Sequence, residues 1–481
     1  MLLLLNFRKH SLMIVIVLLY IVANMVLTYR EIYVLNLVPV IVFVVYLALA
    51  RIDLIYFLII LLTPLSIQLI EFLPSSPIDF AIPTEPLLFG VMLLLIYRGI
   101  KSGLLDRSVF NHPVTYAIVF NLFWLFITSF SSTMPMVSFK FLLARIWFVI
   151  VFYLLAVIIF RNTNNIRTFI LCYTLPMLVV IAYATSRHFT YGLFDKQAAH
   201  FVMNPFFRDH TSYGAILAML FFALGGLVIN KKRGLLLQLI IWGAWIVITG
   251  ALVLSYTRAA WISVLLSMGI LMLILLKIKL KFLLLAGILV VLYLTGQRTA
   301  IIFKMEKNRQ TSSATLSEHI RSISNISTDE SNLERLNRWN SAFRMFRERP
   351  FFGWGPGTYM FKYAPFQRSA EKTGISTDFG NLGNAHSEYI GPLAESGILG
   401  SLSFIFIGLM SLFTGFSVYK KLVDKRLKQI TLGLLLGFIT YLAHGTLNNF
   451  LDTDKASALF WGFTAVFVSL DMSLKKLDTQ N

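Results

Sequence analysis

Two hydrophilic passages decide how this chain can fold: residues 331–363 read SNLERLNRWNSAFRMFRERPFFGWGPGTYMFKY, and residues 384–400 read NAHSEYIGPLAESGILG. They belong to the one long water-soluble region of a 481-residue chain that is 57% hydrophobic and 14% charged. Soluble domains carry about 25% charged residues. The composition therefore indicates a membrane protein, and the two passages predict one large polar loop within it.

Apolar runs of about 20 residues, the length of a membrane-spanning helix, fill most of the remaining chain. We expect each run to be helical, because backbone polar groups in lipid need partners within their own segment. No small-residue cleavage site follows the first run, so we expect it to be retained. The candidate spans are residues 11–28, 33–50, 52–72, 83–98, 114–131, 140–160, 167–186, 212–229, 235–254, 258–277, 281–296, 397–418, 429–446 and 456–473.

These runs predict an all-α polytopic membrane protein with about 12–14 transmembrane helices and three parts. The first part is a transmembrane bundle over residues 1–296. The second is a large outer loop over residues 297–396, which contains helices. The third comprises the C-terminal spans and a short tail over residues 397–481.

The basic residues set the expected orientation. The net charge is +19, but Lys and Arg occur in short clusters between apolar runs, which the positive-inside rule explains better than binding to nucleic acid. Counted from the N-terminus, alternate short loops carry roughly three times as many Lys and Arg as the others. Both termini are therefore predicted to be cytoplasmic. The 297–396 loop is predicted to face outward, since long loops cross regardless of charge.

The sequence predicts neither a metal nor a cofactor. Cys172 is the single cysteine, which excludes a disulfide framework or a multi-cysteine metal site within one chain. The chain contains no HExxH sequence and no P-loop, and its His and carboxylate spacings form no closed metal site.

Within the polar loop, the first passage predicts an amphipathic helix. Ser331 and Glu334 have the spacing of a capping box, apolar side chains then recur at helical spacing, and Pro350 ends the pattern. Arginines occupy the other face, and the glycines of residues 353–357 (GWGPG) predict a tight turn. The Ser- and Thr-rich residues 310–332 are expected to be mobile.

Several polar groups are predicted to lie on the outer side: Ser255–Arg258 at the mouth of a span, Arg208–His210 before another span, the arginine-rich helix and the motif around His386. Arg145 falls inside a span, where a charge is costly and usually faces a cavity. Simpler roles fit as well. Arg145 and Arg258 suit interfacial residues that reach lipid head groups, the helix arginines suit a solvated or lipid-facing surface, and a single loop histidine suits polar surface.

This combination resembles the O-antigen ligase / O-antigen polymerase superfamily of bacterial envelope proteins. The likeness rests on the order and spacing of four passages around one outer loop, and it covers about the second half of the chain. One departure is Ser387, where the family often has Asn. The passages are Arg335-Leu-Asn-Arg338-Trp339 through Pro350-Phe-Phe-Gly353-Trp-Gly355-Pro-Gly357; Asn384-Ala-His386-Ser-Glu388-Tyr389 with Glu395, Gly397 and Gly400; Ser255-Tyr-Thr-Arg258-Ala-Ala-Trp261; and Asp209-His210-Thr-Ser-Tyr213-Gly214.

The resemblance implies a glycosyltransferase of the bacterial inner membrane. Its donor would be a polyprenyl-diphosphate-linked glycan, and its acceptor a glycan or a lipid A core sugar. Arginine offers a fixed charge and a planar fork for phosphate oxygens, so Arg258 is the first candidate for neutralising the leaving diphosphate. His386 suits a general base for the acceptor hydroxyl, because the ordinary histidine pKa of about 6.5 lies near operating pH. Glu388 or Glu395 is expected to orient its ring or to steady oxocarbenium charge.

The expected transfer is metal-independent, with a single displacement and inversion. The donor would be bound by further residues from the same passages, with His210 as a reserve base. These substrate-binding candidates are Arg145, Arg208, His210, Arg335, Arg338, Trp339, Gly353, Gly355, Gly357 and Asn384.

Other functions remain open beside the favoured ligase. A repeat-unit polymerase would use the same donor and the same bond-making step. A protein O-oligosaccharyltransferase is disfavoured, because we expect no sizeable soluble domain after the last span. A transporter of lipid-linked glycans would predict charges in several spans and repeat symmetry, whereas the sequence offers mainly Arg145 and no recognisable repeat.

Overall fold

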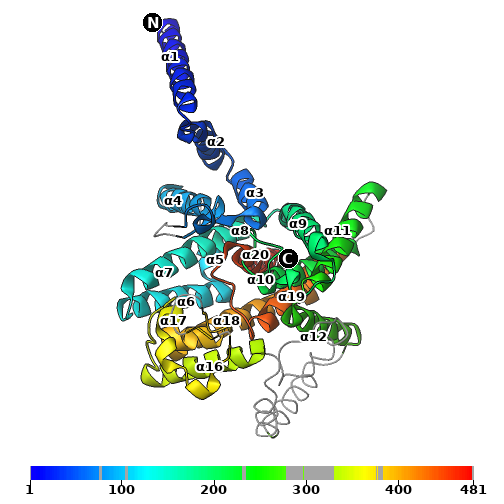
Figure 1. The fold of residues 1–481 in the computed structure, drawn as a ribbon. Helices are drawn as coiled ribbons and strands as arrows, with labels where there is room; N and C mark the ends of the chain where they lie inside the picture. Colours follow the sequence, from blue (N-terminus) through cyan, green and yellow to red (C-terminus); the bar gives the residue numbers. More distant parts are fainter. Residues whose placement is uncertain are drawn as a thin grey trace. The chain divides into compact units, whose positions relative to one another are not determined.

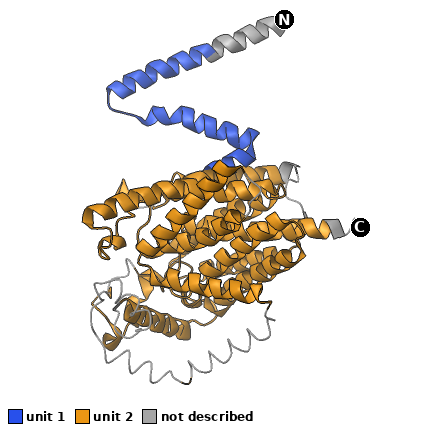
Figure 2. Ribbon diagram, turned by 90° about the vertical axis from the view of Figure 1, so that its right-hand side faces the viewer, with its two compact units in different colours: residues 1–58 blue, residues 59–481 orange. Residues whose placement is uncertain are grey.

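The computed structural model describes residues 2–74, 79–102, 107–229, 234–277, 296, 330–374, 376–377 and 383–478. They divide into two compact units, residues 1–58 and residues 59–481 (Figure 2). The first unit contains α1 (Leu2–Tyr29), α2 (Leu37–Ala50) and the start of α3 (Ile52–Leu62). The turn before α2 packs back on α1, where the Tyr20 hydroxyl donates to the Leu35 carbonyl over 3.0 Å.

The second unit is built from helices. Within the described residues, its strands are β1 (Ile67–Gln68) and β2 (Ala81–Ile82), which pair antiparallel as one short hairpin. The prediction of an all-α polytopic membrane protein is therefore confirmed. The helices are α4 (Thr84–Ser102), α5 (Arg107–Phe110), α6 (Pro113–Phe130), α7 (Pro135–Val149), a π-helical turn (Ile150–Leu155), α8 (Ala156–Ile159), α9 (Asn164–Tyr191), α10 (His210–Val228), α11 (Leu235–Leu254), α12 (Arg258–Leu275), α16 (Glu330–Glu348), α17 (Tyr359–Lys362), α18 (Ile390–Lys421), α19 (Lys425–His444) and α20 (Asp454–Asp478).

Nine helices in the described part of the chain are long and apolar enough to cross a membrane. Each coincides with a predicted span, from α6 through the continuous 135–159 helix to α20. Three further predicted spans correspond to shorter apolar helices, Ile14–Tyr29, Val34–Ala50 and Ile52–Leu65. The 83–98 run forms α4, which is not among the nine. The predicted span 281–296 lies outside the described residues except for residue 296.

The predicted span 397–418 lies within α18, which begins at Ile390 and passes through a kink at Gly397, whose φ is 70°. One local prediction is wrong. The capping box does not form, because α16 already begins at Glu330 and the Glu334 carboxylate instead accepts from Arg338 Nε over 2.7 Å. The stretch expected to be mobile, residues 310–332, lies outside the described residues as far as residue 329.

The last helix, α20, lies at the centre of the second unit (Figure 1). Its membrane-spanning window is 83% buried inside the protein, more than that of any other candidate span. Its neighbours include α7, α8, α10, α18 and α19. Since α20 faces protein rather than lipid, it can begin with charged residues. Asp454 accepts from Ser66 Oγ over 2.6 Å, and Lys455 Nζ donates to the same Oγ over 2.6 Å.

Helices α10 and α19 pack with their backbones in contact, and glycines make this possible. A Cβ atom added to Gly433 would lie 2.4 Å from the Phe222 carbonyl oxygen and 3.0 Å from Gly226 Cα. A Cβ atom on Gly437 would lie 2.7 Å from the Met219 carbonyl oxygen. Small residues at such crossings let membrane helices approach closely and gain van der Waals contact. This contact fixes α10, whose first residue is His210, against the bundle.

We expect Gly433→Ala to lower the thermal unfolding midpoint of the purified protein in detergent. The new methyl group has no space between the two backbones, and overpacking of this kind costs about 1–3 kcal/mol. Gly243→Ala in α11 is the matched control, because an added Cβ meets nothing within 4 Å there. The control should be neutral or slightly stabilising. An unchanged midpoint for Gly433→Ala would contradict the proposed close packing.

Candidate active site

Five segments bring polar side chains together at one end of the helix bundle. α10 and α12 both begin at this end, since α11 runs back between them. The other three segments are α16, the passage before α18, and the connection between α19 and α20, residues 445–453. Hydrogen bonds and electrostatic interactions join these segments, as the following paragraphs describe. The candidate site therefore combines residues that lie far apart in the sequence.

Arg258 is the first residue of α12, and the turn before it is fixed. Tyr256 has a left-handed backbone, with φ of 49°, and its hydroxyl donates to the Phe194 carbonyl over 2.9 Å. The Thr257 hydroxyl donates to the His210 carbonyl over 2.7 Å. These bonds place Arg258 beside the N-terminus of α10.

Arg335 of α16 lies close enough to Arg258 for their charges to interact. Burial, followed by the charge of Arg258, lowers the pKa of Arg335 to about 10, and Asp209 opposes this effect. Arg335 Nε donates to the Leu447 carbonyl over 3.2 Å, and its Nη1 donates to Ser331 Oγ and Asn332 Oδ1, each over 3.1 Å. The structure thus brings together two arginines that the sequence predicted to bind a diphosphate.

Arg338, one turn further along α16, is held differently. It is buried, and its Nε donates to the Glu334 carboxylate over 2.7 Å. Its Nη1 donates to the Asn384 carbonyl over 3.1 Å. Arg338 therefore joins α16 to the histidine motif, and its charge is balanced by a carboxylate.

His386 is half-buried in this cluster, and its backbone is left-handed, with φ of 47°. The Asn384 side-chain oxygen accepts from its backbone N–H over 3.0 Å, which stabilises the turn. Burial lowers the pKa of His386 to about 3, with Arg338 and Arg335 adding to the effect and a hydrogen bond with Asn448 opposing it. The imidazole is therefore neutral near pH 7, but it is a weaker base than a histidine with the ordinary pKa of about 6.5 on which the sequence-based assignment relied.

Ser387 departs from the family pattern but keeps a capping role. Its hydroxyl accepts from the backbone N–H groups of Tyr389 and Ile390, each over 3.3 Å. It therefore satisfies donors at the start of α18, as short polar side chains commonly do at helix N-termini.

Glu388 is buried and binds the 445–453 connection. Its Oε1 accepts from the Tyr441 hydroxyl over 2.6 Å and from the backbone N–H groups of Phe450 and Leu451 over 2.8 Å each. Its backbone N–H donates to the Gly445 carbonyl over 2.8 Å. Burial raises the pKa of Glu388, whereas Arg145 and the Tyr441 hydroxyl lower it. These contacts connect Glu388 to the connection that carries Asn448.

Glu395 binds the glycine turn. Its Oε1 accepts from the Tyr359 N–H over 3.0 Å, and its backbone carbonyl accepts from the Gly355 N–H over 2.8 Å. Gly353 and Gly397, with φ of 68° and 70°, lie where the glycine turn and α18 pack against each other. A Cβ atom added to Gly353 would lie 2.3 Å from the Glu395 carbonyl carbon, and one added to Gly397 would lie 2.0 Å from the Phe351 carbonyl oxygen. Only glycine fits such an approach in this backbone region.

Gly357 and Trp339 complete the loop passages. A Cβ atom on Gly357 would lie 3.2 Å from the Phe141 ring of α7, so the turn also packs on the bundle. Trp339 is half-buried. Within the described residues, its indole Nε1 has no hydrogen-bond partner.

Two predicted arginines lie apart from Arg258. Arg145 Nη1 donates to the Leu451 carbonyl over 3.1 Å, and its charge acts on Glu388 and Asp452. Arg208 is exposed and forms an ion pair with Asp79 over 2.5 Å. His210, the reserve base, stacks on His200 with ring centroids 4.2 Å apart.

Sequence reasoning missed several members of this cluster. The 445–453 connection contributes Asn448, whose Nδ2 lies 3.0 Å from His444 Nε2, and Asp452, which is exposed. Lys196 and His200, between α9 and α10, interact electrostatically with Arg258. The sequence offered one weak indication of these residues, because they stand in short polar connections at the same predicted end of the bundle as the motifs.

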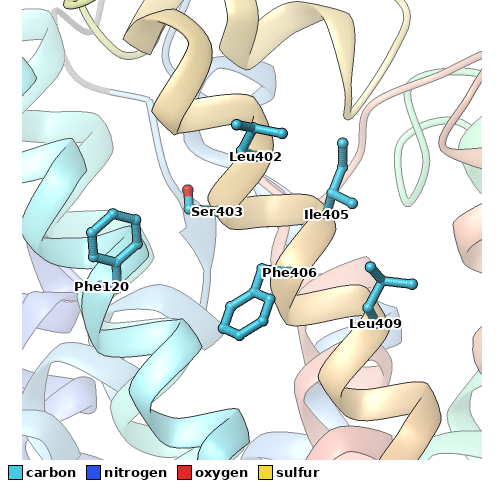
Figure 3. A pocket seen from close by; sticks show the side chains of 6 residues that line it. All are labelled: Phe120, Leu402, Ser403, Ile405, Phe406 and Leu409. Carbon is cyan, nitrogen blue, oxygen red and sulfur yellow. The ribbon is translucent and has the colours of Figure 1, made fainter.

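An apolar groove of about 420 Å³ lies elsewhere, along α6 and α18 (Figure 3). Its lining residues are Phe120, Leu402, Ser403, Ile405, Phe406 and Leu409, of which Ser403 has the one polar side chain. The Ser403 hydroxyl accepts from Asn121 Nδ2 over 2.8 Å. No residue of α10, α12 or α16 lines the groove, so it is separate from the polar cluster.

Residues 242–405 match the family model described as O-antigen ligase. Over these residues, the chain is similar to proteins of the O-antigen ligase superfamily. The matched region includes Arg258, Arg335, His386 and both glutamates, and it ends before α19. No curated protein matches the chain. The match supports a membrane glycosyltransferase of the O-antigen ligase type.

We expect Glu388→Gln to retain most of the transfer activity and Glu388→Ala to lose both activity and thermal stability. Gln keeps an acceptor for the Tyr441, Phe450 and Leu451 donors, whereas Ala leaves them unpaired at about 1–3 kcal/mol each. Glycan transfer and the thermal midpoint should be measured on the same preparations. If Glu388→Gln folds normally but is inactive, the carboxylate charge itself takes part in the reaction.

Proposed function

We propose that this protein transfers a glycan from a polyprenyl-diphosphate carrier to a sugar hydroxyl on the outer face of the bacterial inner membrane. The observation that carries the proposal is the meeting of Arg258, Arg335 and neutral His386 at one end of the helix bundle. The acceptor is proposed to be a sugar of the lipid A core, as in an O-antigen ligase. A repeat-unit polymerase is the alternative, because it would need the same donor and the same bond.

The arginines suit a diphosphate leaving group. Such a group needs neutralisation of charge more than protonation, and preorganised cations stabilise charge that develops in a transition state. Arg258 and Arg335 repel each other in the absence of an anion. The charge of Arg338 is balanced by Glu334. We therefore assign diphosphate binding to Arg258 and Arg335, and a positioning role to Arg338.

His386 is the proposed general base. The acceptor hydroxyl oxygen would attack the anomeric carbon while the bond from that carbon to the diphosphate oxygen breaks. The hydroxyl proton passes to His386, and the lipid diphosphate leaves with the electron pair. One displacement inverts the anomeric configuration, and the step needs no metal. We assign positioning roles to Glu388, Glu395 and the glycine turn, which hold the His386 segment in place.

Orientation and membrane location complete the proposal. Both termini would be cytoplasmic, and the site end of the bundle, defined by Arg258 and His386, would face the periplasm. Support comes from the excess of Lys and Arg in the alternate loops assigned to the cytoplasm. Arg145 and Arg208 lie at the same end but bind other partners, so we place them outside the diphosphate contacts.

We expect His386→Ala and Arg258→Ala each to abolish glycan transfer in a strain that lacks the wild-type gene. Loss of a general base costs about 10²–10⁴ in rate, and loss of a charge-stabilising donor costs about 10²–10³. Gels of envelope polysaccharide give the readout, with membrane insertion checked by fractionation. Arg347→Ala, on the exposed side of α16, is the matched control and should remain active.

The same gels separate the two candidate reactions. Core lipid without polymer, with polymer retained on its carrier, identifies a ligase. A single repeat on the core identifies a polymerase. Full activity of either His386→Ala or Arg258→Ala would refute the site.

We expect kcat/KM to stay high on the acid side until below about pH 5, rather than to fall near the ordinary histidine pKa of about 6.5. A base acts in its deprotonated form, and the pKa of His386 is lowered to about 3, so acidification to pH 5 leaves it unprotonated. The measurement is transfer at low donor concentration across pH 4–8, since kcat/KM reports the free enzyme. A fall of kcat/KM to half its maximum at pH 6.5 would contradict a His386 whose pKa is lowered by burial and by the neighbouring arginines.

A further inference from the structure

The connection between α9 and α10, residues 192–209, is anchored at both ends and lies against the Arg258 turn. Arg187 Nη1 donates to the Asn204 carbonyl over 2.5 Å, and the His188 ring contacts the Asp195 carbonyl over 2.7 Å. The Asp195 carboxylate accepts from the backbone N–H groups of Gln197 and Ala198 over 2.7 and 3.1 Å. This Asx turn fixes the short helical turn Ala198–His200.

The Arg258 turn is attached to this same connection. The hydroxyl of Tyr256 donates to the Phe194 carbonyl over 2.9 Å. At the other end of the connection, His210 stacks on His200, with centroids 4.2 Å apart and planes at 12°. The carbonyl of His210 accepts from Thr257 Oγ1 over 2.7 Å. These contacts hold the connection against the Arg258 turn, and Lys196 and His200 lie close enough to Arg258 for their charges to interact.

We propose that Lys196 and His200 form, with Arg258 and Arg335, one anion-binding wall that holds the diphosphate of the lipid carrier. This inference rests on the proposed function, and it assigns a binding role to two residues outside the region that matches the ligase family.

Repulsion among cations supports the wall. Lys196 is repelled by Arg258, and Arg258 repels Arg335. The Asp209 carboxylate acts on His200 and Arg335, and it also caps α10 by accepting from the N–H groups of Thr211 and Ser212. A bound diphosphate anion would offset the repulsion among the three cations. Charge-assisted hydrogen bonds to phosphate oxygens are the interactions that such side chains make most strongly.

His200 adds a group that can gain charge when the anion binds. The residue is exposed overall, but its ring stacks on His210. Partial burial lowers its pKa most, Lys196 and Arg258 lower it further, and Asp209 raises it. The groups that face it are thus Lys196 on its own connection, Arg258 of α12, and Asp209 with the stacked His210 at the start of α10. A bound anion would offset the field of the cations, so His200 should take up a proton on binding.

The test is calorimetric binding of a short-chain isoprenyl diphosphate to the full-length protein in detergent, with the corresponding isoprenyl alcohol as the uncharged probe. Lys196→Ala should weaken diphosphate binding roughly 10-fold or more, the loss typical of a charged hydrogen bond, and leave alcohol binding unchanged. Lys196→Arg should restore most of the affinity. Lys362→Ala in α17 is the matched control and should bind like the wild type.

Proton uptake tests His200 separately. In two buffers of different ionisation enthalpy at pH 7.5, wild-type protein should take up protons on binding diphosphate, and His200→Gln should take up fewer. If Lys196→Ala and His200→Gln both bind diphosphate like the wild type while Arg258→Ala does not, the wall is refuted and the proposed function stands. If the wild type itself binds diphosphate no better than the alcohol, the proposed function fails, and this inference fails with it.

Discussion

The buried carboxylate of Glu388 is the interaction on which the candidate site depends. It satisfies the N–H groups of Phe450 and Leu451, which a connection between two membrane helices would otherwise leave unpaired away from water. An unpaired buried donor costs about 1–3 kcal/mol, so this one side chain stabilises a backbone course that regular structure does not provide. Arg335 and Arg145 donate to carbonyls of the same connection, at Leu447 and Leu451. Glu388 thereby fixes the position of two cations that it does not contact through a hydrogen bond.

Charge is distributed unevenly around this connection. Arg338 and Glu334 form a buried ion pair with further hydrogen bonds, and breaking such a pair by removing one partner leaves an uncompensated charge. This pair joins α16 to the Asn384–His386 turn. Arg258 and Arg335 instead lie within reach of each other, with Asp209 as the carboxylate that acts on Arg335. A fold that brings like charges together has a free-energy cost that a bound anion removes. The first pair is therefore suited to structure and the second to binding.

The membrane-spanning framework was predictable because its signal is local. Hydropathy over about 20 residues identifies a span without knowledge of its neighbours, and nine described helices coincide with predicted runs. The capping box failed for the opposite reason. Ser331 and Glu334 had the right spacing, but Arg335 and Arg338 compete for their oxygens in the folded protein. The family resemblance identified His386, Arg258 and Arg335, whereas the partners of Glu388 lie more than fifty residues away in sequence, which no spacing rule reports.

Three polar residues of the site were missed because they belong to no sequence motif. Asn448, Lys196 and His200 stand in short connections whose composition is ordinary, and they gain significance only from what the fold places beside them. Backbone geometry gives a second, independent sign of the same region. His386 and Tyr256 are both left-handed without being glycine, a conformation that costs roughly 1–3 kcal/mol and tends to occur where the surrounding structure enforces it. Here the enforcing contacts are the Asn384 turn and the Tyr256–Phe194 hydrogen bond. Since His386 is itself the proposed base and Tyr256 lies two residues before Arg258, the strain is best explained as the cost of holding the base and this cation in position before substrate arrives.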